Sequence, residues 1–351
     1  MKIAQVAPLY ESVPPLLYGG TERVVSHLVE ELVRQGHEVT LFASGDSTTS
    51  ATLVPACRRA LRLDTNCQDS LAHHIVMLDE VFRRASNFDM IHFHVDYLHF
   101  PLSSRLRIPN ITTLHGRLDL PELTSVYRQF PDMPVVSISD AQRRPIPRAN
   151  WVGTVYHGVP ARLFSLDPEP GQYLAFLGRI SPEKGLDRAI EVAKRVEMPL
   201  RIAAKVDRVD KEYFECQIKP MLDHPLIEYI GEISEEEKQD FLGGACALLF
   251  LVDWPEPFGL AMIEAMACGT PVIAFRRGSV PEVVDENVTG FIVDNVQQAA
   301  EAVARIGNIS RSGCRNAFER RFTSARMAAD YVDIYNLVQS REAPLLSIRL
   351  Q

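Results

Sequence analysis

The 351-residue sequence has no long apolar segment, since no run approaches the roughly 20 consecutive apolar residues that a membrane-spanning helix needs. Its first residues, Met1 to Pro8, are typical of the start of a strand rather than of a signal peptide. These two absences predict a cytoplasmic protein. Hydrophobic residues still make up 46% of the chain, which is enough to build complete cores.

Cysteine is sparse and scattered. The six cysteines lie at least ten residues apart and include no C-x-x-C pair. This spacing indicates neither a cysteine-based zinc site nor a dense disulfide framework. We therefore expect reduced thiols, several of them buried.

Positive charge is in deficit, with 37 basic and 45 acidic side chains and a net charge of −8. This balance argues against a nucleic-acid-binding protein with a broad basic surface. The first 160 residues are nearly neutral and contain paired arginines at Arg58-Arg59, Arg83-Arg84 and Arg143-Arg144. Two interpretations of these pairs stay open: an ordinary solvated surface, or weak peripheral contact with an anionic membrane or acceptor.

The chain reads as two α/β units in series, as its length also suggests. Each unit alternates short apolar runs with loops and amphipathic helices, a pattern that predicts parallel sheets with right-handed crossovers. The expected strands of the first unit are 3–7, 39–43, 90–93, 110–114 and 135–137. Those of the second unit are 173–177, 200–203, 227–230, 247–252 and 272–274.

Residues 253–271 contain two carboxylates around a predicted helix start. An apolar strand from Ala245 to Val252 is broken by two prolines, and Gly259 then opens a helix. Glu256 precedes this helix and Glu264 lies inside it. A helix N-terminus at the end of a parallel strand is where open α/β sheets bind ligands and where free amides hold anions. The segment therefore predicts a binding site for a phosphorylated ligand.

The Glu-x7-Glu spacing, with Phe-Gly-Leu inside it and Glu-Ala-Met-Ala-Cys-Gly-Thr-Pro-Val after it, resembles the signature of the family 4 retaining glycosyltransferases. The resemblance implies that Glu256 lies beside the donor sugar and that Glu264 binds the ribose hydroxyls of a sugar nucleotide. It also implies that backbone amides around Phe258, Gly259 and Leu260 face the sugar or the pyrophosphate.

The same resemblance implies the GT-B form of the α/β class, in which two Rossmann-like domains with parallel sheets face each other across a cleft. The first domain would span residues 1–156 and carry the acceptor side. The second, 157–322, would bind the nucleotide sugar. A C-terminal helix, residues 323–345, would cross back onto the first domain.

A second group of candidate residues follows the first strand of the second unit. Ser181 and Pro182 suit a helix start, so we expect Lys184 in the first helical turn, where a cation is unfavourable without an anion nearby. Arg179 offers a planar fork for phosphate oxygens. In the family the matching Arg and Lys bind the donor pyrophosphate. The alternative is an exposed turn in which Lys184 pairs with Glu183 or Asp187.

Two further candidate sites lie in the first unit. Gly19 and Gly20 precede a helix and resemble the family's mobile glycine loop near the donor phosphate, although a simple strand-to-helix turn has the same pattern. His115 follows a strand, and the resemblance places it beside the donor sugar. His92 and His94 point to one side of a strand, as a metal site requires, but we favour strand-end packing and acceptor contact.

The resemblance implies transfer of a hexose to a hydroxyl group with retention and without a metal or cofactor, and it makes UDP-glucose the first donor to test. The acceptor stays open among small molecules, lipids and saccharides. Two alternatives remain: a non-hydrolysing UDP-N-acetylglucosamine epimerase, and a nucleotide-sugar-binding protein without activity.

Overall fold

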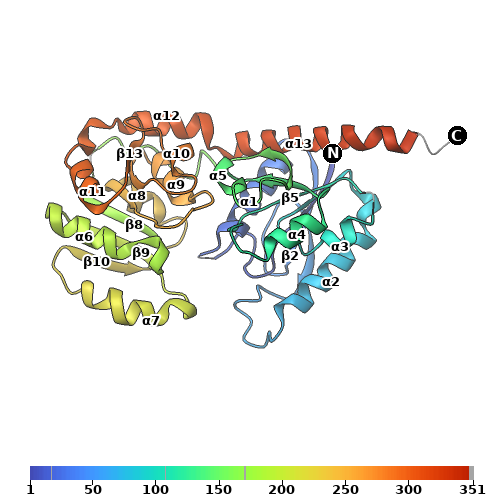
Figure 1. Ribbon diagram of the computed structural model, residues 1–351, viewed down its shortest axis with the longest axis horizontal. Helices are drawn as coiled ribbons and strands as arrows, with labels where there is room; N and C mark the ends of the chain where they lie inside the picture. The colour runs from blue at the N-terminus through green and yellow to red at the C-terminus, as the bar shows by residue number, and fades with distance from the viewer. Residues whose placement is uncertain (17, 107, 170, 348–351) are drawn as a thin grey trace. The chain divides into compact units, whose positions relative to one another are not determined.

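The computed structural model describes residues 1–16, 18–106, 108–169 and 171–347. The chain divides into two compact units. Unit 1 comprises Met1–Gly158 together with the C-terminal segment from Ser324, and unit 2 comprises Val159–Thr323 (Figure 1).

Unit 1 is built on a parallel sheet in which seven described strands follow the order β3-β2-β1-β4-β5-β6-β7. The strands are β1 (Lys2–Val6), β2 (Glu38–Ser44), β3 (Thr52–Cys57), β4 (Met90–Phe93), β5 (Asn110–Thr113), β6 (Pro134–Ser137) and β7 (Asn150–Thr154). The helices are α1 (Gly20–Arg34), α2 (Ser70–Arg83), α3 (Phe100–Ser103), α4 (Leu123–Gln129), α5 (Asp140–Arg143) and α13 (Ser324–Ser347), with a 3-10 turn at Ala85–Asn87.

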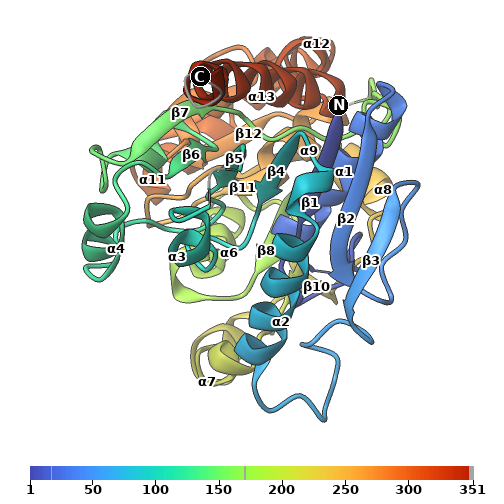
Figure 2. The ribbon, with the colours of Figure 1, turned by 90° about the vertical axis from the view of Figure 1, so that its right-hand side faces the viewer.

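The long helices of unit 1 form because their sequences combine an apolar face with a defined start. In α1, Val24, Val25, Leu28 and Leu32 recur at helical spacing and are fully or almost fully buried. In α2, the Asp69 side chain accepts hydrogen bonds from the amides of residues 71 and 72. Helix α13 returns to lie beside α1 and β7 (Figure 2). Sequence segments at the two ends of the chain therefore share one core.

Unit 2 contains a second parallel sheet, with six described strands in the order β10-β9-β8-β11-β12-β13. The strands are β8 (Tyr173–Arg179), β9 (Leu200–Lys205), β10 (Ile227–Gly231), β11 (Ala245–Phe250), β12 (Val272–Phe275) and β13 (Gly290–Val293). The helices are α6 (Leu186–Val196), α7 (Lys211–Tyr213), α8 (Lys238–Gly243), α9 (Leu260–Ala267), α10 (Val280–Val283), α11 (Val296–Val303) and α12 (Arg311–Arg321).

Shorter turns complete unit 2. They are the 3-10 turns Pro182–Lys184, Arg208–Asp210, Lys219–Met221 and Ile306–Asn308, and a π-helical turn at Phe214–Ile218. Helix α6 packs beside α11 and α12 packs beside α9. The prediction of an α/β protein with two parallel, Rossmann-like sheets is confirmed.

Each sheet has a point where the strand order reverses. In unit 1 it lies between β1 and β4, and in unit 2 between β8 and β11. At such a point the loops leaving the two neighbouring strands diverge to opposite faces and open a crevice beyond their carboxyl ends. These two places are where side chains with binding chemistry are expected.

Candidate functional site

The reversal point of unit 2 gathers most of the predicted donor-site residues. Arg179 is the last residue of β8, and the loop that carries Glu256 follows the neighbouring strand β11. The two loops are tied together, since the amide of Asp253 donates to the Glu183 carbonyl over 2.8 Å. Residues about seventy positions apart in the sequence thus meet at one sheet edge.

Glu256 forms an ion pair with Lys184. The Lys184 Nζ lies 2.5 Å from Glu256 Oε2, and the indole Nε1 of Trp254 donates to the same oxygen over 2.7 Å. The Lys184 ammonium also lies 5.3 Å from the centre of the Trp254 ring. Glu256 is 9% exposed, so its charge is compensated by neighbours rather than by bulk water.

The position of Lys184 corrects one prediction. Lys184 does not lie in the first turn of α6 but ends the separate 3-10 turn Pro182–Lys184, and α6 starts only at Leu186. Gly185 interrupts the helix with a φ of 73°. A Cβ on Gly185 would lie 2.2 Å from the Leu251 carbonyl oxygen, so this close approach requires glycine. The pairing alternatives of the exposed turn are wrong as well, because Lys184 pairs with Glu256.

The loop around Glu256 is held from behind by the segment after β12. The Ser279 amide donates to the Glu256 carbonyl over 3.0 Å, and the Ser279 hydroxyl donates to the Phe258 carbonyl over 2.7 Å. Gly278 has a φ of 51°, and a Cβ there would lie 2.2 Å from the Glu256 carbonyl oxygen. The backbone of Glu256 is therefore held by the segment that contains Gly278 and Ser279.

Arg179 lies in an acidic environment. Its guanidinium contacts Glu183 at 2.6 Å, Asp210 at 3.5 Å and Asp207 at 3.6 Å. Burial raises the pKa of Asp210, and Arg179 only partly offsets this. Burial also acts to raise the pKa of Glu183, but hydrogen bonds from its own amide, Ser181 and Arg179 outweigh it and lower that pKa. Three carboxylates thus offset the charge expected to bind phosphate.

Helix α9 begins at Leu260 after Gly259, which has a φ of 89°. Within the described part of the chain, no side chain caps this N-terminus. Glu264, one turn further on, is 2% exposed and pairs with Lys238 through a 2.6 Å contact to Oε1. The Phe258 side chain is buried against Phe322 at 6.2 Å, so Phe258 offers the site its backbone rather than its ring.

The glycine pair of unit 1 lies at the start of α1. Gly19 occupies the N-cap position and Gly20 is the first helical residue. Gly19 is buried and Gly20 is exposed. A Cβ on Gly19 would lie 2.7 Å from Pro15 Cβ, so packing within the loop already accounts for this glycine.

His115 follows β5 by two residues, and its Nε2 lies 2.8 Å from the Nδ1 of His94. Burial lowers the pKa of His115 to about 3, so the ring is neutral at physiological pH. Among the described residues, the Nδ1 of His115 has no hydrogen-bond partner. The His115 ring stacks on His157, with ring centres 5.3 Å apart.

His92 and His94 do share one side of β4, as alternation predicted, with ring centres 4.0 Å apart. Both rings use their two nitrogens in hydrogen bonds to protein groups. Within the described ranges, no three His, Cys, Asp or Glu side chains are grouped to hold a metal ion. The arginine pair on α2 is compensated, since Arg83 contacts Asp79 and Arg84 contacts Glu80.

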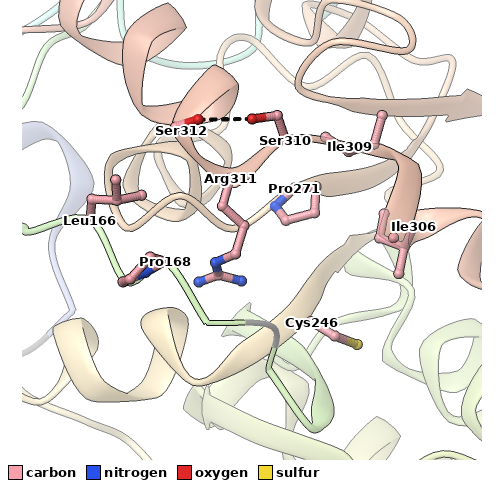
Figure 3. A pocket seen from close by; sticks show the side chains of 10 residues that line it. Leu166, Pro168, Cys246, Pro271, Ile306, Ile309, Ser310, Arg311 and Ser312 are labelled. Carbon is pink, nitrogen blue, oxygen red and sulfur yellow. Dashed lines mark hydrogen bonds between the residues drawn. The ribbon is translucent and has the colours of Figure 1, made fainter.

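A hollow of about 340 Å³ in unit 2 lies away from these residues (Figure 3). Cys246 and Pro271, which line it, stand at the amino ends of β11 and β12, opposite the edge that carries Glu256. Arg311 faces the hollow, but its guanidinium donates to the carbonyls of Asp167, Gly243 and Ala245. The Arg311 guanidinium thus joins the loops that carry these carbonyls.

Sequence reasoning missed several residues that complete the site. Trp254 and Gly278 adjoin the predicted carboxylate, and glycine after a buried strand was a usable signal for Gly278. Lys238 beside Glu264 and Asp210 beside Arg179 carried no signal, because each pairing depends on how separate loops fold together.

Comparison with known families agrees with this arrangement. Residues 163–321 match the family described as glycosyl transferases group 1, and residues 18–155 match glycosyltransferase family 4. Paired Rossmann-like units of this kind are the GT-B fold. The two matches together span most of the chain, and the protein belongs to family 4 of the glycosyltransferases.

Curated relatives are distant. An uncharacterised glycosyltransferase of Methanocaldococcus jannaschii is 26% identical over 226 residues, which cover 60% of this chain and 62% of the relative. The chain thus matches less than two thirds of that relative's length. A phosphatidyl-myo-inositol mannosyltransferase of Mycobacterium leprae is 24% identical over 372 residues, covering 96% of this chain and 97% of the relative.

Solved structures share the fold. A glycosyltransferase of avilamycin A biosynthesis superposes with a TM-score of 0.76 at 24% identity, covering 97% of this chain and 98% of that one. The Anabaena protein HepE, in complex with UDP and glucose, gives a TM-score of 0.72 at 18% identity, with 95% and 98% coverage. None of the described helices is long and apolar enough to cross a membrane.

Proposed function

We propose that this glycosyltransferase transfers a hexose, with glucose as the first candidate, from a UDP-sugar to a hydroxyl acceptor with retention at the anomeric carbon. The observation that carries the proposal is the grouping of the Lys184–Glu256 pair with the start of α9 at the reversal point of unit 2. A cation, a carboxylate and open helix amides suit a ligand that combines a diphosphate with a hydroxylated sugar.

The donor side of the reaction lies in unit 2, within the proposed domain 157–322. Breaking the bond between the anomeric carbon and the phosphate oxygen leaves negative charge on the diphosphate and positive charge on the sugar ring. Lys184, Arg179 and the amides of Phe258, Gly259 and Leu260 stabilise the diphosphate, and Glu264 holds the ribose. The acceptor oxygen bonds to the anomeric carbon, and the leaving phosphate oxygen takes up the proton of the acceptor hydroxyl. The proposed steps require no metal.

The acceptor side lies in the proposed domain 1–156 with the returning helix 323–345. His115 and Glu256 position the sugar, and Gly19 and Gly20 allow close approach of the backbone to the phosphates. In this proposal the reaction requires the anomeric carbon to be aligned with the acceptor hydroxyl.

The choice of donor is supported by neighbours of the same fold. HepE structures contain UDP, UDP with glucose, and UDP-glucose. The relatives are named as a phosphatidyl-myo-inositol mannosyltransferase, a D-inositol 3-phosphate glycosyltransferase and a probable sucrose-phosphate synthase, so their names point to different acceptors. The proposal therefore leaves the acceptor class open and commits to the donor.

A ligand panel tests the donor assignment. We expect UDP and UDP-glucose to raise the melting temperature, with little effect from the GDP or ADP equivalents, because a ligand bound only by the folded state stabilises it. Glu264→Gln should abolish most of the shift, and Glu301→Gln, the same change at an exposed position of α11, should retain it. A shift with GDP or ADP instead, or an equal shift in Glu264→Gln, would contradict the donor and ribose assignments.

A further inference from the structure

A continuous chain of hydrogen bonds runs through unit 1 beneath His115. It joins His115 to His94 (2.8 Å), His94 to Gln5 (2.8 Å), Gln5 to Tyr335 (3.0 Å), Tyr335 to His92 (2.9 Å), His92 to Thr113 (2.7 Å) and Thr113 to Tyr331 (2.9 Å). Every member except His115 is at most 3% exposed. A buried polar chain of this length needs every link satisfied.

The fold places these side chains on one face of the sheet. Gln5 of β1 is in register with His92 of β4, and these strands are adjacent at the reversal point. His94 and His115 each lie two positions beyond His92 and Thr113, so alternation keeps them on the same face. Tyr331 and Tyr335, one helical turn apart on α13, complete the chain.

The histidines in this chain are neutral. Burial lowers the pKa of His92 and His94 well below the usual value, and that of His115 to about 3. A neutral imidazole has one N–H and one bare nitrogen. His92 and His94 use both nitrogens in hydrogen bonds, so each must donate on one side and accept on the other.

Gln5 sets the direction of donation, because its amide has distinct donor and acceptor ends. Its Nε2 donates to the Tyr335 hydroxyl, and its Oε1 faces the Nε2 of His94. His94 must therefore carry its proton on Nε2 and accept on Nδ1. His115 then donates its Nε2–H to that nitrogen and keeps a bare Nδ1.

We infer that Gln5, acting through His94, is a positioning residue that holds His115 in the Nε2–H tautomer and leaves Nδ1 as the acceptor for a substrate hydroxyl. The inference rests on the proposed function for the identity of that hydroxyl, which belongs to the donor sugar. The tautomer itself follows from unit 1 alone.

The environment of the His115 Nδ1 supports this direction independently. The atom is buried and has no partner among the described residues. The opposite direction, with the Gln5 amide reversed, would place a proton on this nitrogen and bury an N–H without an acceptor. Orphaned buried N–H groups are rarer than under-used acceptors. The direction with a bare Nδ1 is therefore favoured.

Long-range ¹H–¹⁵N correlation spectra read the tautomer directly. In the wild-type protein without ligand, we expect the His115 resonances to show a protonated Nε2 and a bare Nδ1, with their assignment taken from their loss in His115→Gln. A protonated Nδ1 in that spectrum would overturn the inference whether or not the protein binds a nucleotide sugar. Failure of the proposed function is thus distinguishable from failure of this one.

Two variants test the role of Gln5. Gln5→Met removes the amide NH₂ and C=O groups and keeps a side chain of similar volume. Both tautomers of His115 should then be populated. The variant should weaken UDP-glucose binding about fivefold while leaving UDP unchanged, as expected for about 1 kcal/mol from one hydrogen bond. Tyr331→Phe removes the last link of the chain and should change neither the tautomer nor the affinity ratio.

Equal effects of the two variants would show that Gln5 acts only through packing. An unchanged tautomer in folded Gln5→Met would also overturn its role. If Gln5→Met does not fold, the wild-type spectrum and Tyr331→Phe still decide the tautomer and whether the far end of the chain sets it.

Discussion

Acidification should destabilise unit 1 far more than unit 2. Nine of the ten histidines lie within residues 1–158. Burial lowers the pKa of seven of them in the folded state, less for His37 and His74 and strongly for His92, His94, His99, His115 and His157. The unfolded chain titrates near 6.5, so below that pH it binds more protons than the folded unit. The contribution of these histidines to the stability of unit 1 is therefore fully present above about pH 6.5. It is lost as the pH falls toward their pKa values in the folded state.

The size of the effect follows from the linkage relation. A histidine that stays neutral when folded loses about 1.4 kcal/mol of stabilising free energy between pH 7.5 and pH 5.5. The five strongly shifted groups together contribute at most about 7 kcal/mol, which is comparable with the whole unfolding free energy of many domains. Asp96 acts in the opposite sense, because desolvation of its carboxyl raises its pKa to about 6, but this single group offsets only a small part of the effect of the histidines.

The two tryptophans make the assay specific, because Trp151 lies in unit 1 and Trp254 in unit 2. Urea unfolding would be followed by fluorescence in Trp254→Phe, which reports unit 1, and in Trp151→Phe, which reports unit 2. We expect the Trp151 midpoint to fall steeply from pH 7.5 to pH 5.5 and the Trp254 midpoint to change little. A Trp151 midpoint that does not fall, or an equal fall in both, would refute the neutral buried histidines as the cause.

Three predictions concern unit 2. Lys184→Met leaves the Glu256 carboxylate without its cation and should weaken UDP-glucose binding at least tenfold in calorimetry; retained affinity would remove Lys184 from the site. Asp210→Asn removes one of the carboxylates around Arg179 and should tighten UDP binding severalfold at low salt. Weaker binding would show instead that the Asp210 carboxylate positions Arg179 for the ligand. Gly278→Ala should lower the unfolding free energy, measured by urea denaturation, by about 2 kcal/mol or more. The added Cβ would clash with the Glu256 carbonyl oxygen, and the backbone at this position is left-handed. An unchanged urea midpoint would contradict that packing.

The sequence predicted ten of the thirteen described strands because their signals are local, and it missed the edge strands β3, β7 and β13. Apolar runs bounded by glycine and proline mark buried strands, and β8, β11 and β12 lie within a few residues of the expected positions. Gly259 as the start of α9 was equally local, since proline and glycine dictate where a helix can begin. Local rules failed at Gly185, which separates the 3-10 turn Pro182–Lys184 from helix α6. The Leu251 carbonyl, which is distant in sequence, lies close to Gly185, and no local pattern predicts that contact.

The electrostatic partners could not be predicted in the same way. The expected cations, Arg179 and Lys184, were identified, but each proved to be paired with carboxylates. Asp210 reaches Arg179 only because β9 lies beside β8, and Gln5 reaches Tyr335 only because α13 returns to unit 1. Such pairs depend on strand order and register, which one sequence does not encode in any short pattern.

The most direct test of the proposed reaction is NMR analysis of products formed from UDP-[¹³C]glucose with a panel of hydroxyl acceptors. UDP-glucose carries the α configuration, so the account predicts UDP release together with a new α-linked anomeric signal, both reduced strongly in Lys184→Met. A β-linked product would contradict retention. Epimerised nucleotide sugar without an acceptor, or nucleotide binding without any turnover across the panel, would contradict hexose transfer itself.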